Sequence, residues 1–139
     1  MAIPPEMIVA EFVHTQGGVG YNGLVLKQEF MPSLPNFVGF VEATQTLMIC
    51  EKNPQDLRGH MLIHEISCRV VYKEQSGSCA RATNEEYQAV PQGSKALYAA
   101  LRLEFYRALV RYHTEQGSDP KFIQEITASR ELWAQWASP

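Results

Sequence analysis

The sequence predicts an α+β domain. In it, an antiparallel sheet of roughly four to five strands from the N-terminal half packs against a long helix at 94–116 and a C-terminal helix at 120–137. Residues 6–73 contain runs that alternate or are rich in β-branched side chains, whereas the last third of the chain carries apolar residues at helical spacing. Strands followed by helices, without alternation, indicate α+β. A length of 139 residues suits one hydrophobic core, so we expect a single domain over 1–139.

The first two predicted strands form a hairpin. Residues 6–14 alternate between two faces, and residues 24–30 resume an extended pattern of apolar and polar side chains. Between them, residues 15–23 hold four glycines and an Asn-Gly pair, which tolerate positive φ. We expect a long, loose hairpin tip here.

The middle of the chain is expected to complete the sheet. Residues 36–52 contain several poor helix formers and are predicted as two short strands, with a helix opened by Pro35 after Ser33 as the alternative. Residues 60–73 are rich in Ile and Val and are predicted as the longest, central strand. A capping-box pattern with Thr83 as the cap and Glu86 three residues later then predicts a helical turn from Asn84.

The segment from Ser94 to Gly117 is predicted as one long helix. Ser94 is suited to cap the first free amides, and Gly117 can end the helix in the left-handed conformation. Two adjacent apolar stripes run along it: Ala99, Leu103, Tyr106 and Val110 on one, and Leu101, Phe105, Ala108, Leu109 and Tyr112 on the other. Because this surface is broader than one packing partner normally covers, we expect the helix to be central in the domain or shared with a second subunit.

A final helix is predicted after this one. Asp119 can cap it and Pro120 suits its first position. Large apolar side chains then share one stripe: Phe122, Ile126, Trp133 and Trp136. We expect this helix to pack by its tryptophan face.

Composition and charge exclude several function classes. A net charge of −3 and a pI near 5.8 give no basic footprint, so neither nucleic acid nor an anionic membrane is expected as a partner. No apolar run approaches the roughly 18 to 20 residues that a membrane span requires. The odd count of three cysteines and the lack of a secretion pattern at the start predict reduced thiols and a cytoplasmic protein.

Arg102 is the most unusual residue of the long helix. It falls inside the apolar surface between Tyr98 and Tyr106, with His113 on the same line. Its guanidinium could lie along the tyrosine rings, pair with a carboxylate, bind an anionic group or reach solvent. Arg102, Tyr106, His113 and Tyr98 are therefore the candidate binding residues, and no catalytic residue is predicted.

A metal site is a weaker candidate. His60, His64 and Cys68 recur every fourth residue, and all three side chains can bind zinc. Residues four apart on a strand are separated by about 13 Å, so one ion could join His60 and His64 only if this segment were helical. Because a strand is predicted, no metal and no cofactor are expected.

The residues from Gly18 to Gly23 satisfy the G-x-G-x-x-G pattern of phosphate-binding loops. A dinucleotide site needs these glycines to open a helix, whereas a strand is predicted after them. A flexible hairpin tip is the simpler interpretation.

These observations favour a small protein-binding module, with a regulatory, inhibitory or assembly role, that forms a homodimer through the long helix. Its partner would be another protein chain. The alternative is a small-molecule-binding protein or enzyme with a pocket between sheet and helices, in which Arg102 holds an anionic group.

Overall fold

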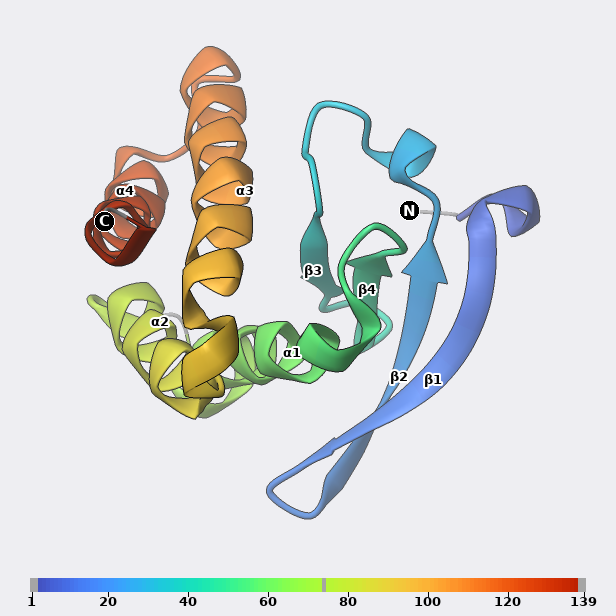
Figure 1. The fold of residues 1–139 in the computed structure, drawn as a ribbon. Coiled ribbons are helices and arrows are strands. Elements are labelled where there is room, and N and C mark those ends of the chain that lie inside the picture. The colour runs from blue at the N-terminus through green and yellow to red at the C-terminus, as the bar shows by residue number, and fades with distance from the viewer. Residues whose placement is uncertain (1–2, 74, 138–139) are drawn as a thin grey trace.

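A four-stranded sheet lies beside four α-helices in the computed structural model, which describes residues 3–73 and 75–137 (Figure 1). The α+β class, the approximate number of strands and both C-terminal helices are confirmed. The strands are β1 (Ile8–Gln16), β2 (Val19–Leu26), β3 (Val38–Val41) and β4 (Thr46–Cys50), and the helices are α1 (Arg58–Ile66), α2 (Ser78–Ala89), α3 (Lys95–Glu115) and α4 (Pro120–Ala137).

The sheet is mixed, so the prediction of a wholly antiparallel sheet is wrong. The strand order is β1-β2-β4-β3, with β1 and β3 antiparallel to their neighbours but β2 parallel to β4. After β2, residues 27–37 carry the chain to the far edge, where β3 forms. The chain then returns as β4 between β3 and β2. The two short strands predicted within 36–52 are confirmed.

The β1–β2 hairpin has a tight tip rather than the loose one predicted. Gly17 and Gly18 have φ of 60° and 77°, which suits a two-residue turn between antiparallel strands. β2 begins at Val19, so the second half of the glycine-rich segment is strand.

The strand predicted at 60–73 is wrong. This segment forms α1, and a π-helical turn at Ser67–Val71 continues it. In α1 and the turn before it, the buried apolar residues form two pairs four residues apart, Leu57 with Met61 and Leu62 with Ile66. Burial of this helical stripe outweighs the β preference of Ile and Val, since propensity is a weak prior against tertiary packing.

The predicted start of α2 is also wrong. The helix begins at Ser78, after Gly77 with φ of 82°, rather than at Asn84. Thr83 is therefore not a cap but a fully buried residue in the middle of α2. This earlier start brings Cys79 into the first turn of the helix.

The ends of α3 agree with the prediction to within one residue. Gly117 adopts a φ of 66° just beyond the helix, and Asp119 accepts a hydrogen bond from the Lys121 amide at 2.9 Å, as expected for the start of α4. Ser94 lies in a short 3-10 turn, and its side chain makes no capping hydrogen bond.

The broad apolar surface of α3 is largely covered within the chain. α4 runs beside α3 (Figure 1), and Trp133 of α4 is fully buried. On α3, Tyr98 and Phe105 are buried, while Leu97 and Tyr112 stay 57% and 39% exposed. The breadth of this surface therefore does not require a second subunit, and the homodimer stays a prediction. None of the helices in the described residues has the length and hydropathy needed to span a membrane.

Candidate metal centre

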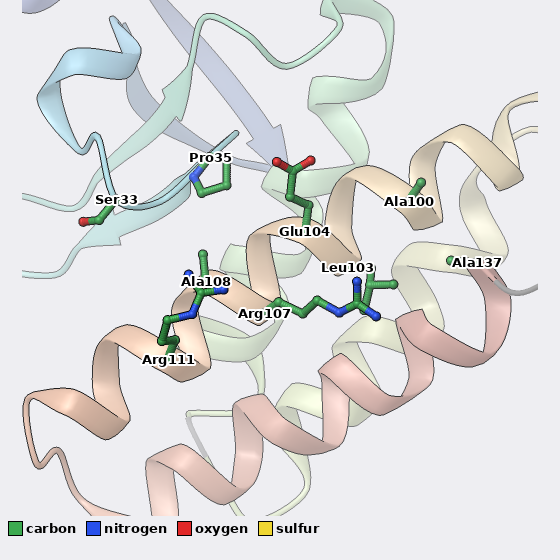
Figure 2. Close-up of a pocket in the computed structure, with 9 residues that line it drawn as sticks. All are labelled: Ser33, Pro35, Ala100, Leu103, Glu104, Arg107, Ala108, Arg111 and Ala137. Atoms are coloured by element: carbon green, nitrogen blue, oxygen red, sulfur yellow. The ribbon is translucent and has the colours of Figure 1, made fainter.

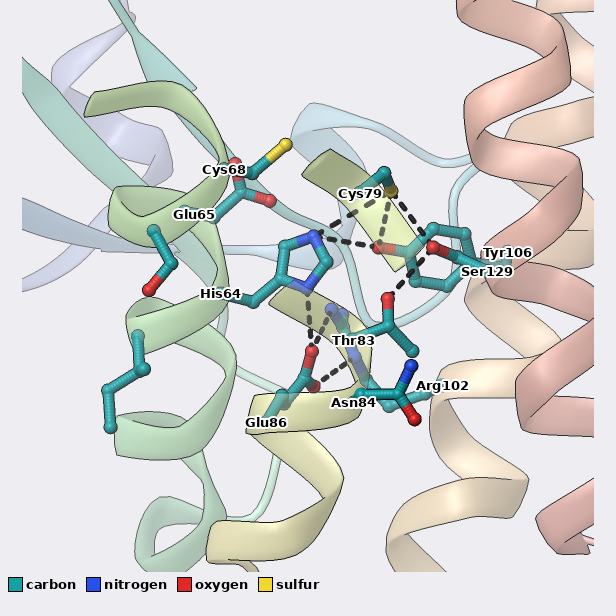
Figure 3. A network of polar contacts seen from close by, with 12 residues as sticks. His64, Glu65, Cys68, Cys79, Thr83, Asn84, Glu86, Arg102, Tyr106 and Ser129 are labelled. Atoms are coloured by element: carbon teal, nitrogen blue, oxygen red, sulfur yellow. Dashed lines mark hydrogen bonds and ion pairs between the residues drawn. The ribbon is translucent and has the colours of Figure 1, made fainter. Parts of the chain in front are cut away.

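A network of buried polar side chains lies where the four helices meet (Figure 3). Buried polar groups are costly unless they have partners, so a cluster of this size needs a physical reason. Its members, here called the polar network, are His64, Glu65, Cys68, Cys79, Thr83, Glu86, Tyr98, Arg102, Tyr106 and Ser129.

Glu86 is the centre of the polar network. Its carboxylate lies 2.7 Å from Arg102 Nε and 2.9 Å from His64 Nδ1, and it also accepts a hydrogen bond from the Tyr98 hydroxyl. Burial alone would raise the pKa of Glu86, but the Arg102 charge and the bonds from His64 and Tyr98 hold that pKa below its usual value. The carboxylate is therefore charged, with its counterion inside the protein.

The contact with Glu86 fixes the orientation of the His64 ring. With Nδ1 held by the carboxylate, Nε2 points the other way, to 3.9 Å from Cys79 Sγ and 3.2 Å from the Tyr106 hydroxyl. A carboxylate on one imidazole nitrogen is the usual second partner of a histidine whose other nitrogen binds a metal. Nε2 is thus presented as the ligand atom.

Two cysteines complete a group of metal ligands with His64. Cys68 follows His64 by one helical turn, and Cys79 lies in the first turn of α2. One ligand atom from each of the three residues lies within 4.8 Å of the other two. Bonds of about 2.0 to 2.3 Å place the ligands of a tetrahedral zinc about 3.5 Å apart, so small side-chain adjustments suffice to hold an ion.

The thiols interact with each other and with hydroxyl groups. The hydrogen bond between the two thiols lowers the pKa of Cys68 and raises the pKa of Cys79. Ser129 Oγ lies 2.9 Å from Cys79 Sγ and 2.8 Å from Thr83 Oγ1, which ties α4 to α2 at the sulfur. Such outer contacts orient the first-turn cysteine toward His64.

A cleft of about 570 Å³ connects this group to solvent. Cys68 and Cys79 both line it, whereas His64 and Tyr106 lie behind them in the core. The opposite wall comes from the start of α4 and includes Phe122, Glu125 and Ile126. An ion held by the two sulfurs and the imidazole would therefore be reachable from outside.

Glu65 lies beside this cluster. Figure 3 shows its carboxylate next to Cys68, and the side chain is almost fully buried. His64, Glu65 and Cys68 together form the pattern His-Glu-x-x-Cys along a helix. The H-E-x-x-H pattern places two ligands on one helical face with a glutamate between them as general base, and here Cys68 stands at the second ligand position.

Three of the four predicted binding residues lie in the polar network, and the fourth lies outside it. Tyr98, Arg102 and Tyr106 belong to the polar network, and Arg102 pairs with a carboxylate, one of the alternatives that its position on the helix left open. His113 lies apart, with Nδ1 at 2.8 Å from Ser118 Oγ. His60 packs edge-on against Tyr98, at 6.0 Å between ring centroids, and does not join His64 as a ligand.

Sequence reasoning missed Glu65, Cys79 and Glu86. The H-E-x-x-C pattern could have indicated Glu65, but it brings the two ligands to one site only if the segment is helical. No local pattern links Cys79 or Glu86 to His64, because α2 reaches the site through tertiary packing.

A second hollow, of about 610 Å³, lies between α3, the segment before β3 and the end of α4, and is separate from the polar network (Figure 2). Its lining includes Glu104, Arg107 and Arg111 of α3, together with Ser33 and Pro35. These charged side chains are exposed, and no histidine or cysteine is among the lining residues. It offers no comparable set of metal ligands.

Comparison of the chain with known family models, with curated proteins and with solved structures finds no match.

Proposed function

We propose that the protein is a zinc-dependent hydrolase that cleaves an amide bond, with a peptide as the first substrate to test. One observation carries the proposal: ligand atoms of His64, Cys68 and Cys79 lie within 4.8 Å of one another beside a cleft, with Glu86 bound to the far side of the imidazole.

The donor set favours zinc. Thiolate sulfur with imidazole nitrogen suits zinc better than the hard cations calcium and magnesium, which prefer oxygen. Three protein ligands with a fourth position left for water or substrate are typical of catalytic rather than structural zinc sites. The cleft at Cys68 and Cys79 provides that access.

The neighbouring groups favour hydrolysis. Zinc would supply a Lewis acid that polarises a carbonyl and lowers the pKa of water. Glu65 is the candidate general base, because it is next to the ligands and its carboxylate acts electrostatically on both Cys68 and Tyr106. The Tyr106 hydroxyl lies 3.2 Å from His64 Nε2 and 3.9 Å from Cys79 Sγ, behind these ligands, and is suited to orient them around the ion.

Metal content is the first test. Protein purified without chelator is expected to hold one zinc ion per chain by elemental analysis, and cobalt substitution should give the absorption bands of thiolate coordination. Cys68→Ser should lose the ion. Cys50→Ser is the matched control, since Cys50 is a fully buried cysteine of β4 that hydrogen-bonds Gln28 and lies outside the ligand group found among the described residues. A chain that binds neither zinc nor cobalt would refute the proposal.

Activity is the second test. Glu65→Gln should keep the metal but slow cleavage of a fluorogenic peptide or casein substrate about 100-fold or more, as expected for loss of a general base. Glu104→Gln, on the exposed side of α3, is the control and should leave the rate unchanged. A Glu65→Gln protein as active as the parent would remove the assigned mechanism.

Recognition of another protein chain is the second candidate function, and exposed apolar side chains support it. Val9 and Val13 of β1 are 50% and 67% exposed, and the β1–β2 hairpin extends beyond the helices (Figure 1). If this surface joins two copies, Val13→Asp should convert a dimer into a monomer in sedimentation. A parent protein that is monomeric at micromolar concentration would remove the homodimer.

A further inference from the structure

The two sulfurs of the candidate metal centre are also close to each other, which gives them a chemistry of their own. Cys68 and Cys79 lie on different elements, the π-helical turn at Ser67–Val71 and the first turn of α2, yet their sulfurs are within 4.8 Å. Both are free thiols. A disulfide requires the sulfurs to approach to about 2.05 Å, a movement of the size that rotation about a cysteine Cα–Cβ bond provides.

The surroundings of the pair expose one thiol to solvent more than the other. Both cysteines line the cleft, but Cys68 is partly exposed whereas Cys79 is only 7% exposed. The remaining cysteine, Cys50, is fully buried in β4. The arrangement is that of an attacking thiol at the surface with a resolving thiol next to it.

We propose that Cys68 and Cys79 form a reversible thiol–disulfide site that reacts with low-molecular-weight disulfides such as oxidised glutathione. This inference rests on the proposed function only for its consequence, which is that oxidation removes two of three zinc ligands. The oxidised form then holds no zinc.

The exchange proceeds in two balanced steps. The Cys68 thiolate attacks oxidised glutathione, so that a bond forms between Cys68 sulfur and one glutathione while the other glutathione leaves as a thiolate. Cys79 sulfur then attacks Cys68 sulfur, which forms the Cys68–Cys79 disulfide and releases the second glutathione. The protein loses two electrons, the reagent gains them, and the two thiol protons end on the released glutathione molecules.

Alkylation after oxidation tests the pair directly. The full chain, stripped of metal, is treated with oxidised glutathione, alkylated with iodoacetamide and mapped by mass spectrometry. We expect a Cys68–Cys79 disulfide, with Cys50 still reduced. Cys79→Ser should instead retain glutathione on Cys68, because the resolving thiol is gone, and Cys68→Ser should acquire little adduct. If Cys68 and Cys79 both remain alkylatable in the parent chain, the inference is overturned.

The zinc-loaded chain separates this inference from the proposed function. Oxidation of loaded protein should release its zinc to a chromophoric chelator, and dithiothreitol followed by zinc should restore it. Zinc that stays bound while both thiols stay reduced in the stripped chain overturns the thiol–disulfide site and leaves the hydrolase proposal intact. A disulfide that forms in a chain unable to bind zinc supports the thiol pair and refutes the hydrolase proposal.

Discussion

The sheet and the helical half of the molecule bury very different side chains. In the sheet (residues 8–50) the fully buried positions are apolar, as at Leu26, Leu47 and Ile49. In the helical half (residues 58–137) fully buried positions include the charged residues Glu86 and Arg102. The two regions share one hydrophobic core, and among the described residues the ion pair buried within it, Glu86 with Arg102, lies between helices.

This difference indicates which region is shaped by stability alone. Apolar burial contributes about 25 cal/mol per Å², and it needs no precise partner. A buried ion pair is often no more stable than apolar residues of the same size, because both charges lose their hydration. The polar network is therefore better explained by what Glu86 does for His64 than by its contribution to folding.

The largest expected effect comes from breaking the ion pair. Glu86→Ala leaves the Arg102 guanidinium buried without its carboxylate, which should lower the free energy of unfolding by about 4 kcal/mol. Glu104→Ala, exposed on α3, should change it by less than about 0.5 kcal/mol. Urea denaturation measures both. A loss below about 1 kcal/mol in Glu86→Ala would mean that water enters the helical half.

An apolar truncation in the sheet gives the matching measurement for the other region. Leu47 of β4 is fully buried, so Leu47→Ala should cost about 3 kcal/mol through lost burial and the cavity left behind. Unlike Glu86→Ala, it should leave zinc binding unchanged once the protein is folded. If Leu47→Ala abolished zinc binding in folded protein, the proposed separation of the two regions would be wrong.

The elements that the sequence predicts well are those with local signals. α3 and α4 carry their start and stop residues next to a helical stripe, and Gly117 and Asp119 act as expected. α1 was predicted as a strand because residues such as Ile63 and Val70 favour strands, although the buried residues recur with helical spacing. No local sequence pattern predicts the strand order. The order depends on the segment after β2, which carries the chain to the far edge of the sheet before β3 forms.

The site was predictable only in part. Arg102 stood out because a charge on an apolar helical face needs a partner, but nothing adjacent to Glu86 marks it as that partner. His64 and Cys68 are recognisable as possible metal ligands, but the strand predicted at 60–73 would separate them by about 13 Å. One error in α1 therefore concealed the candidate metal centre, while the third ligand, Cys79, depends on packing between helices.

Replacing one glycine in each region by alanine should change stability by a smaller amount and with opposite signs. A Cβ on Gly23 of β2 would lie 2.1 Å from the Phe12 ring, so Gly23→Ala should cost about 1 to 3 kcal/mol by overpacking. Gly59 of α1 has nothing within 4 Å, and Gly59→Ala should stabilise by up to about 1 kcal/mol through helix propensity. Thermal unfolding measures both. Adding Phe12→Ala to Gly23→Ala should relieve the clash, and a double variant with no coupling between the sites would contradict this packing.

The smallest effect concerns a histidine of the helical half that lies outside the polar network. His113 contacts the Ser118 hydroxyl and the Phe122 ring, and partial burial lowers its pKa below the usual 6.5. The unfolded chain then binds the proton more readily, so the contribution of His113 to stability is present above about pH 6.5 and is lost as the pH falls through the folded-state pKa. Titration of its ring protons by NMR should give a midpoint below 6.5, and His113→Gln should flatten the stability profile in that range. A midpoint above 6.5 would mean that a negative charge, rather than burial, controls this histidine, which would extend the electrostatic character of the polar network to the end of α3.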